Sequence, residues 1–370
     1  MRKLRVALII ATLDRAGAEK QLALLARRLD PAQFEVAVYA LTRGGPHEAE
    51  IKAAGIPVTV LNKAFKYDLR VVPRLERMLK ERQTDIAYTW MFTANAFGRA
   101  AALRAGVPVV IAGEQDSGPK PALHHWLDRR LGRRTDAIVA NSAGVREYGL
   151  GHGWPAEKIR LIHAGIDPAE IDAQPVLAAP LPEVPAGHKL IVTACRLTRQ
   201  KGLLYLMWAM GLLRHSRCPV HLWIVGDGPE RSRLAWEVQR MRVEGYVTLL
   251  GPRTDVPAIL RRADIFILPS FHEGMSNAVL EAMLAGTPVV VSDVAGMREL
   301  VADGRCGRLV EPGYPKGIAA GIFQAVKYED ETRRMAREGA EWIRQEFSAD
   351  LFVRRHEELF LELAQKKGLA

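Results

Sequence analysis

The stretch FHEGMSNAVLEAMLAGT (residues 271–287), followed at once by PVVV (residues 288–291), places a helix directly before a strand. Ser276 or Asn277 can cap this helix, because either side chain can accept a hydrogen bond from an amide of the first turn. Gly286 can end it in the left-handed conformation, and the proline cannot continue it. The three valines then predict a buried strand. This succession is typical of an α/β fold.

Two carboxylates stand in the same stretch. Glu273 lies in a glycine-containing loop, and Glu281 lies in the otherwise apolar helix. A carboxylate is costly to bury unless it is paired. Its two acceptor oxygens suit the hydroxyls of a vicinal diol, and the amides of a helix N-terminus suit a diphosphate. The sequence therefore favours a ligand site, with a capped helix beside a surface loop as the alternative.

Apolar runs alternate with amphipathic stretches along the whole chain, which predicts parallel strands joined by crossover helices in doubly wound sheets. In the first half, strands are expected at residues 4–11, 35–41, 58–61, 86–89, 109–112 and 137–140, and helices at 18–29, 48–54, 69–83 and 95–105. In the second half, strands are expected at 190–194, 221–225, 247–250, 265–268 and 289–292, and helices at 203–214, 229–237, 330–346 and 350–366.

Residues 174–187 interrupt this alternation. The segment contains four prolines and a single charged residue, Glu183, and it reads as a linker. A chain of 370 residues is also long for one core. We therefore expect a first domain over residues 1–175, a second over 186–346 and a C-terminal helix over 347–370.

The composition describes a globular protein, with 48% hydrophobic and 25% charged residues. Cys195, Cys218 and Cys306 have neither metal-ligand spacing nor a paired pattern, which favours a reducing cytoplasm. The basic N-terminus and the apolar run after it look like a signal peptide, but no small-residue cleavage site follows, so a first strand is expected. No apolar run reaches the ~18 residues that a membrane span needs.

The net charge of +10 lies mostly in the first half of the chain. Residues 1–180 contain 26 Lys and Arg against 19 Asp and Glu, whereas residues 181–370 contain 26 against 23. This excess indicates an anionic membrane surface or an anionic acceptor. Nucleic acid is not expected as a partner, because no recognised binding motif is present.

Further short motifs follow one another along the chain, at residues 162–167, 196–202, 225–230, 251–256 and 294–299. Together with residues 271–287, they resemble the retaining family 4 glycosyltransferases of GT-B fold, over nearly the whole chain. The resemblance implies two doubly wound, Rossmann-like domains that face a central cleft, with the last helix crossing back to the N-terminal domain. It also implies donor binding mainly on the C-terminal domain and acceptor binding mainly on the N-terminal one.

The resemblance assigns roles around the donor. In the family, the first glutamate of the motif contacts the transferred sugar and the second binds the ribose, which gives these roles to Glu273 and Glu281. Arg196 and Lys201 match an arginine and a lysine that hold the donor diphosphate and would stabilise its developing charge. Two solvated cations near a turn are the alternative. The expected catalytic residues are Arg196, Lys201 and Glu273, and the expected donor contacts include Gly274, Met275, Ser276, Asn277 and Glu281.

Three more positions match donor-side loops of the family. Gly226 lies in a loop that resembles a Rossmann phosphate loop but lacks the third glycine and the later ribose acid, so a nicotinamide is not expected. Turning the chain is the alternative role for this glycine. Arg253 matches a position near the nucleotide base, through its side chain or its backbone alone. Gly17 keeps the second position of a paired-glycine loop, and Ala16 replaces the first, at a cost if that position needs a positive φ.

The acceptor side is expected at residues 114–116. Many relatives have a histidine where this chain has Gln115, and glutamine cannot shuttle a proton near neutral pH. Glu114 or Asp116 could orient the acceptor instead, and the donor phosphate could itself take the acceptor proton. We therefore expect Glu114, Gln115 and Asp116 to line the acceptor side.

Neither a metal nor a cofactor is expected. No Asp-x-Asp motif stands out, and Arg196 and Lys201 already supply positive charge. The expected co-substrate is a UDP- or GDP-sugar, and the expected acceptor is a glycan or a lipid-linked intermediate. Two other functions stay open: another GT-B activity such as a nucleotide-sugar epimerase, and a non-catalytic nucleotide-sugar binding protein, which Ala16 and Gln115 leave possible.

A basic and aromatic segment, residues 119–134, follows the acceptor loop. Trp126, flanked by His124, His125, Arg129, Arg130, Arg133 and Arg134, could lie at a lipid headgroup layer. A solvated helix face is the equally supported alternative. The expected location is therefore cytoplasmic, with peripheral contact at the inner face of an anionic membrane as one possibility.

Overall fold

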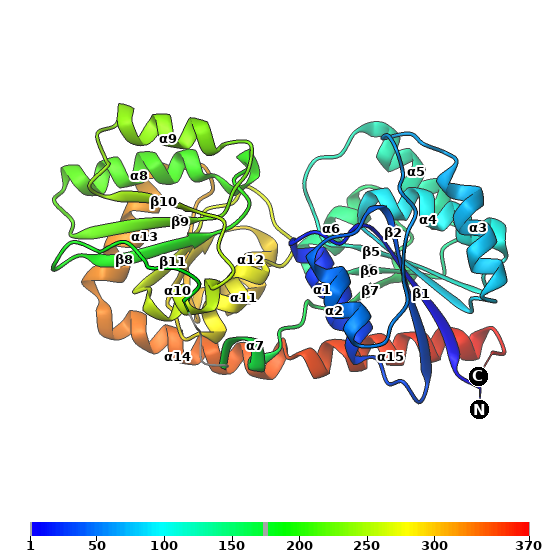
Figure 1. Cartoon of the computed structure of the whole chain (residues 1–370). Coiled ribbons are helices and arrows are strands. Elements are labelled where there is room, and N and C mark those ends of the chain that lie inside the picture. Colours follow the sequence, from blue (N-terminus) through cyan, green and yellow to red (C-terminus); the bar gives the residue numbers. More distant parts are fainter. Residues whose placement is uncertain (1, 173–176, 370) are drawn as a thin grey trace. The chain divides into compact units, whose positions relative to one another are not determined.

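The computed structural model describes residues 2–172 and 177–369. By its internal packing the chain divides into two units, residues 1–165 with 349–370 and residues 166–348 (Figure 1). The expected linker contributes neither helix nor strand at residues 177–187, and its residues 174–176 lie outside the described part. The first division falls at residues 165/166, earlier in the chain than the expected boundary at 175.

The first unit is built on a parallel sheet of seven strands in the order β3-β2-β1-β4-β5-β6-β7. Successive strands run outward from β1 in one direction and from β4 in the other, which makes the sheet doubly wound with its switch point between β1 and β4. The strands are β1 (Leu4–Thr12), β2 (Phe34–Arg43), β3 (Val58–Val60), β4 (Ile86–Trp90), β5 (Val109–Glu114), β6 (Ala137–Ala140) and β7 (Ile159–Leu161).

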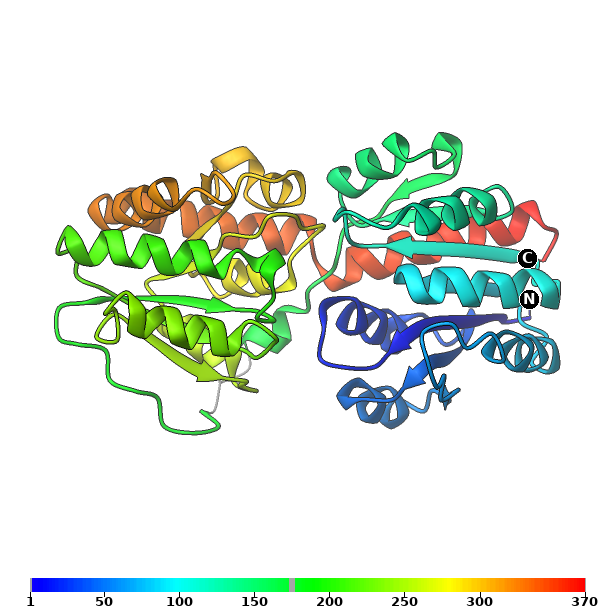
Figure 2. The same cartoon turned by 90° about the horizontal axis from the view of Figure 1, so that it is seen from above.

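Helices cover both faces of this sheet (Figure 2). They are α1 (Gly17–Arg28), α2 (Pro46–Ala53), α3 (Val71–Glu81), α4 (Met91–Ala105), α5 (Ala122–Gly132), α6 (Ala143–Gly151) and α15 (Ala349–Lys366), with a short 3₁₀ turn at Ala156–Lys158. Alternate residues of β1 enter different cores, because successive side chains of a strand point to opposite faces. Val6 and Leu8 pack with α1 and α15, whereas Ala7 and Ile9 pack with α3 and α4.

The C-terminal helix α15 belongs to the first unit, as expected. Phe352, Leu359, Phe360 and Leu363 of this helix are buried in the same core as β1 and α1. The preceding helix, α14 (Glu329–Glu346), belongs to the second unit. The predicted break near residues 347–348 is therefore confirmed.

The second unit contains a parallel sheet of six strands in the order β10-β9-β8-β11-β12-β13, with its switch point between β8 and β11. Its strands are β8 (Lys189–Ala194), β9 (Val220–Val225), β10 (Val247–Gly251), β11 (Ile265–Leu268), β12 (Val289–Ser292) and β13 (Arg308–Val310). The remaining helices are α7 (Pro168–Asp172), α8 (Leu203–His215), α9 (Arg231–Arg240), α10 (Val256–Arg262), α11 (Asn277–Leu284), α12 (Ala295–Leu300) and α13 (Pro315–Lys327), with 3₁₀ turns at Arg199–Lys201 and Ala302–Gly304.

The two doubly wound sheets confirm the predicted fold class. Within the described residues, no helix is both long enough and apolar enough to cross a membrane. In open sheets of this kind, ligands bind outside the carboxyl ends of the strands at the switch point. The loops that follow β8 and β11 are therefore the first place to look for a site.

Candidate functional site

The loops after β8 and β11 are joined at the switch point of the second unit. The turn Arg199–Lys201 follows β8, and residues 269–276 follow β11. The Phe271 amide donates to the Gln200 carbonyl at 2.8 Å, and the Gln200 side chain donates to the His272 carbonyl at 2.9 Å. Gly202 has a φ of +65°, and a Cβ there would lie 2.0 Å from the Pro269 carbonyl oxygen. Only glycine allows this close approach.

This junction brings Lys201 and Glu273 together. The Lys201 ammonium pairs with Oε1 of Glu273, and the two side chains are 17% and 9% exposed. The hydroxyl of Ser270 donates to the same oxygen at 2.8 Å, and Ser270 is fully buried. The expected catalytic lysine and glutamate are therefore in contact, and a third residue fixes the carboxylate.

Sequence reasoning missed Ser270. The available signal was a hydroxyl residue directly after Pro269 at the end of a predicted strand, three positions before Glu273. Arg196, the other expected cation, is exposed on the loop after β8.

The glycines of the β9–α9 loop serve packing between loops. Gly226 has a φ of +128°, and a Cβ there would lie 2.0 Å from the Cys195 carbonyl oxygen. A Cβ on Gly228 would lie 2.5 Å from the Leu197 carbonyl oxygen, and the Leu197 amide donates to the Asp227 carbonyl at 2.9 Å. The two glycines thus pack against Cys195 and Leu197, the residues on either side of Arg196, and so fix the backbone at Arg196. They support the turning role for Gly226, and its contact with a ligand stays a prediction.

Helix α11 begins as expected, but without the expected cap. Ser276 occupies the N-cap position, yet its side chain makes no capping hydrogen bond, and Asn277 is already helical. The reason is that the Val279 amide bonds to the Ser276 main-chain carbonyl instead, at 3.1 Å. Gly286 follows the helix with a φ of +77°, as predicted.

The remaining residues of the donor motif lie along the start of α11 and the loop before it. Gly274, Met275 and Ser276 are buried, whereas Asn277 and Glu281 are half-buried. Partial burial of Glu281 fits the expectation that this helix carries a carboxylate for a purpose other than solvation.

Arg253 is engaged within the protein. Its guanidinium pairs with Asp255 at 2.5 Å and donates to the Ala179 carbonyl at 2.9 Å. The Asp255 carboxylate also accepts a hydrogen bond from the Ala178 amide, at 2.8 Å. Arg253 therefore fastens the linker to the loop after β10, and its side-chain contact with a donor stays a prediction.

In the first unit, Ala16 and Gly17 form the entry to α1. Ala16 is the N-cap residue with a φ of −137°, and Gly17 is the first helical residue. This position needs no positive φ, so alanine carries no conformational penalty there. The replacement of the first family glycine is therefore structurally neutral in this chain.

Glu114, at the end of β5, is enclosed by hydrogen bonds. Its Oε2 pairs with the Lys120 ammonium at 2.5 Å, and its Oε1 accepts from the amides of Gln115 at 3.1 Å and Asp116 at 3.3 Å. Burial raises the pKa of Glu114. Burial lowers the pKa of Lys120, but the charge and hydrogen bond of Glu114 outweigh this, so that its pKa lies above the ordinary value.

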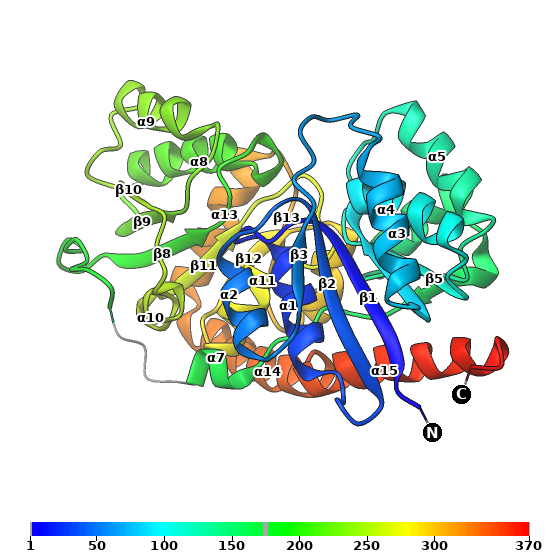
Figure 3. The ribbon, with the colours of Figure 1, turned by 45° about the vertical axis from the view of Figure 1, so that its right-hand side comes forward.

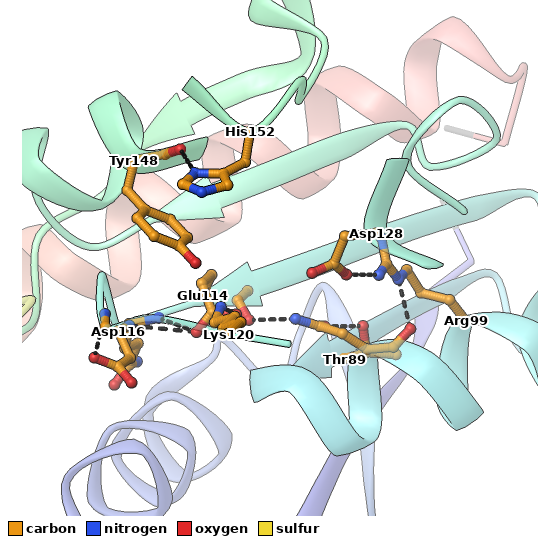
Figure 4. A network of polar contacts seen from close by, with 12 residues as sticks. Thr89, Arg99, Glu114, Asp116, Lys120, Asp128, Tyr148 and His152 are labelled. Carbon is orange, nitrogen blue, oxygen red and sulfur yellow. Dashed lines mark hydrogen bonds and ion pairs between the residues drawn. The ribbon is translucent and has the colours of Figure 1, made fainter. Parts of the chain in front are cut away.

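A second buried ion pair lies beside this one (Figure 4). Arg99 on α4 pairs with Asp128 on α5, and their side chains are 2% and 8% exposed. The Arg99 side chain also donates to the main-chain carbonyl of Asn95. The side-chain amide of Asn95 in turn donates to the Gly113 carbonyl at 2.9 Å. The network thus connects β5, α4 and α5.

The expected acceptor residues therefore differ in accessibility. Both carboxylate oxygens of Glu114 are engaged in closing the loop of residues 115–120. Gln115 and Asp116 are half-exposed. These two residues are better placed than Glu114 to meet an acceptor.

Within the described residues, no group of three or more His, Cys, Asp or Glu could hold a metal ion.

Two protein families match the chain. Residues 15–170 match the family described as Glycosyltransferase Family 4, and residues 188–327 match Glycosyl transferases group 1. Among curated relatives, the alpha-maltose-1-phosphate synthase of Mycolicibacterium smegmatis is 30% identical, over 71% of this chain and 74% of the relative. The Escherichia coli UDP-Gal:alpha-D-GlcNAc-diphosphoundecaprenol alpha-1,3-galactosyltransferase is also 30% identical, over 70% and 71%.

Two further similarities extend this result. The lipopolysaccharide core biosynthesis glycosyltransferase LpsE of Rhizobium meliloti is 30% identical, over 64% of this chain and 66% of the relative. The crystal structure of Anabaena HepE in complex with UDP-glucose shares the fold, with a TM-score of 0.85 at 22% identity, over 97% of this chain and all of the other. Two doubly wound units with parallel sheets of seven and six strands, which match solved glycosyltransferase structures, are a GT-B architecture. The chain belongs to the family 4 glycosyltransferases.

Proposed function

We propose that this protein transfers a sugar from a UDP- or GDP-sugar to a hydroxyl of a glycan or lipid-linked acceptor. The observation that carries the proposal is the contact between Lys201 and Glu273 at the switch point of the second sheet. Two loops that are 72 residues apart in sequence converge there. This is the part of an open α/β sheet that binds ligands.

In this proposal the donor lies over the carboxyl ends of β8 and β11. Glu273 contacts the sugar, Arg196 and Lys201 hold the diphosphate, and Glu281 accepts hydrogen bonds from the ribose. The first turn of α11 offers its amides to the phosphates. The proposed donor contacts also include Gly226, Arg253, Gly274, Met275, Ser276 and Asn277 in the second unit and Gly17 in the first.

The chemistry follows from these groups. The bond between the sugar C1 and the diphosphate oxygen breaks, and a bond forms between C1 and the acceptor oxygen. The acceptor proton passes to the departing phosphate, because Gln115 cannot take it. Gln115 and Asp116 orient the acceptor. Arg196 and Lys201 stabilise the charge on the leaving group, and the anomeric configuration is retained without a metal ion.

Relatives support the choice of donor and acceptor. HepE was crystallised with UDP-glucose, and the E. coli relative is named for UDP-galactose and a diphosphoundecaprenol-linked sugar. A UDP-hexose and a lipid-linked glycan are therefore the first substrates to test.

The test begins with a panel of UDP- and GDP-sugars, screened by thermal shift and then by release of the nucleoside diphosphate in excess chelator. Proton NMR of the first product should show the donor's anomeric configuration. Inverted product, or activity restored only by a divalent ion, would contradict the proposed chemistry. An isomerised nucleotide sugar formed without acceptor would indicate an epimerase, and binding without turnover would indicate a binding protein.

A further inference from the structure

The loop between β3 and α3, residues 62–70, exposes three large apolar side chains. Phe65, Tyr67 and Leu69 are 58%, 61% and 71% exposed. Single exposed apolar residues are ordinary, but a cluster of them marks an interaction site. Sequence reasoning gave this loop no role.

The exposure is a property of the folded loop. Asp68 is buried, accepts a hydrogen bond from the Ala64 amide at 3.1 Å and pairs with Arg70 at 2.8 Å. The buried Lys63 donates to the Phe65 carbonyl at 2.7 Å. The hydrogen bonds that Asp68 accepts from Arg70 and from the Ala64 amide hold its pKa well below the usual range. The polar side chains therefore fix the backbone, and the apolar ones point outward.

Helix α5 has the same construction. Leu123 and Trp126 are 53% and 51% exposed, and the Arg130 guanidinium lies 5.7 Å from the centre of the Trp126 ring. Asp128 faces inward to its buried pair with Arg99 (Figure 4). This pair fixes the rotation of α5 and so keeps the tryptophan at the surface.

The loop and α5 both contact α4: the Lys63 ammonium of the loop lies 5.1 Å from the centre of the Phe97 ring of α4, and Figure 3 shows both segments at the same end of the first unit. His124 on α5 is near enough to Lys66 of the loop to feel its charge: burial and then this charge lower the pKa of His124, with smaller effects from other charges around it. The His124 ring stacks on Phe92 of α4, with 3.4 Å between ring centres. The two segments therefore form one surface, here called the aromatic-basic surface: residues 62–70 together with residues 119–134.

The exposed charges of this surface are all positive. Its only acids, Asp68 and Asp128, are buried and paired with arginines. The exposed cations are Lys66, Arg70, Arg129, Arg130, Arg133 and Arg134. Aromatic side chains surrounded by exposed Lys and Arg suit the interface of an anionic membrane, where rings enter the headgroup layer and cations meet lipid charge.

We infer that the aromatic-basic surface docks on an anionic lipid bilayer, with the loop of residues 62–70 and α5 inserting together. This inference extends the proposed function, because it would present the enzyme to a lipid-linked acceptor. It rests on none of the donor residues, so either can fail without the other.

The experiment is co-sedimentation of the full chain with vesicles of phosphatidylcholine, with and without phosphatidylglycerol, at low and high salt. The wild type should bind only the anionic vesicles and should be released by salt. A variant with Arg129, Arg130, Arg133 and Arg134 changed to Gln should bind about fivefold more weakly for each charge removed. A second variant, Phe65→Ser with Tyr67→Ser and Trp126→Ser, should lose binding although its charge is unchanged.

The second unit offers a matched control. Trp236 and Phe323 are 56% and 46% exposed, and Arg240 lies 5.2 Å over the Trp236 ring. Trp236→Ser with Phe323→Ser should leave vesicle binding intact, and thermal melts should show all variants folded. Donor turnover without vesicles should be unchanged in every variant.

Three outcomes would overturn the inference. The wild type could fail to bind anionic vesicles at low salt. The control could lose binding as much as the loop variant does. The wild type could form a dimer in solution that the loop variant abolishes, which would identify the surface as a protein interface instead.

Discussion

Each unit holds a Lys–Glu ion pair at the carboxyl edge of its sheet, and the two pairs differ in their surroundings. Lys201 and Glu273 come from loops on either side of a switch point, and Ser270 shares the bonded oxygen. Lys120 lies only six residues after Glu114, and β5, which carries Glu114, is one strand removed from the switch point. Main-chain amides donate to the other carboxylate oxygen of Glu114.

The difference teaches that an ion pair near a strand end does not by itself identify a catalytic site. The pair in the first unit closes a loop, so its loss should change stability. The pair in the second unit joins two loops at the proposed donor site, so its loss should change chemistry. The predictions below test this division.

The largest effect is expected at Lys120. Lys120→Met leaves the Glu114 carboxylate buried without its partner and should lower the free energy of unfolding by about 3–5 kcal/mol. Urea unfolding measures this loss. The double variant Lys120→Met with Glu114→Leu should recover much of it, because no buried charge remains. A single variant as stable as the wild type would show that the pair contributes little.

His356, which lines the same small pocket as Glu114, should give the first unit a pH-dependent stability. Burial lowers its pKa to about 4 from the ordinary 6.5. A base with a lowered pKa in the folded state stabilises the protein above pH 6.5, and this contribution is lost as the pH falls toward 4. The loss is roughly 3 kcal/mol. His356→Phe should flatten the unfolding free energy over this range, and an unchanged slope would contradict the assignment.

Lys201→Met should lower turnover by about 10²-fold if the lysine stabilises leaving-group charge, as proposed. Its free energy of unfolding should fall less than that of Lys120→Met, because Glu273 keeps the hydrogen bond from Ser270. Arg199 lies in the same turn with a side chain that is 84% exposed, so Arg199→Met is the control and should remain active. A raised substrate constant with normal turnover would show uniform binding instead of transition-state stabilisation.

The smallest effect is expected at Ser270. Ser270→Ala removes one hydrogen bond to Glu273 and should lower turnover about fivefold, the equivalent of ~1 kcal/mol. Ser292, at the end of the neighbouring strand β12, is equally buried, and its hydroxyl has no partner among the described residues. Ser292→Ala should therefore be neutral. Equal losses in both variants would point to general packing and not to positioning of the carboxylate.

The order of strands and helices could be predicted because it depends on local patterns of buried residues. Strands β11 and β12 match the predicted residues 265–268 and 289–292. Strands β7 and β13 were missed, because each has three residues and shows too little alternation to recognise.

The site could be predicted only in part. The motif placed Glu273 and Lys201, but no sequence pattern shows which hydroxyl closes on a buried carboxylate, so Ser270 was missed. The pairing of Glu114 with Lys120 could not be predicted, because this contact depends on how the loop of residues 115–120 folds. The available signal for this pairing was a lysine six residues after Glu114 that lies between two prolines, Pro119 and Pro121. The predicted side-chain cap at Ser276 was wrong, because the Val279 amide donates to the main-chain carbonyl of Ser276 and not to its hydroxyl.

The claim that the second unit binds the nucleotide is tested most directly by calorimetric titration of UDP and GDP into the wild type and Glu281→Ala. We predict that the variant binds the preferred nucleotide more weakly by about 1.5–3 kcal/mol, the range for a hydrogen bond to a charged group. Glu244→Ala, which removes an exposed glutamate of the same unit, should bind as the wild type does. Equal affinity in Glu281→Ala and the wild type would contradict the donor site described for α11.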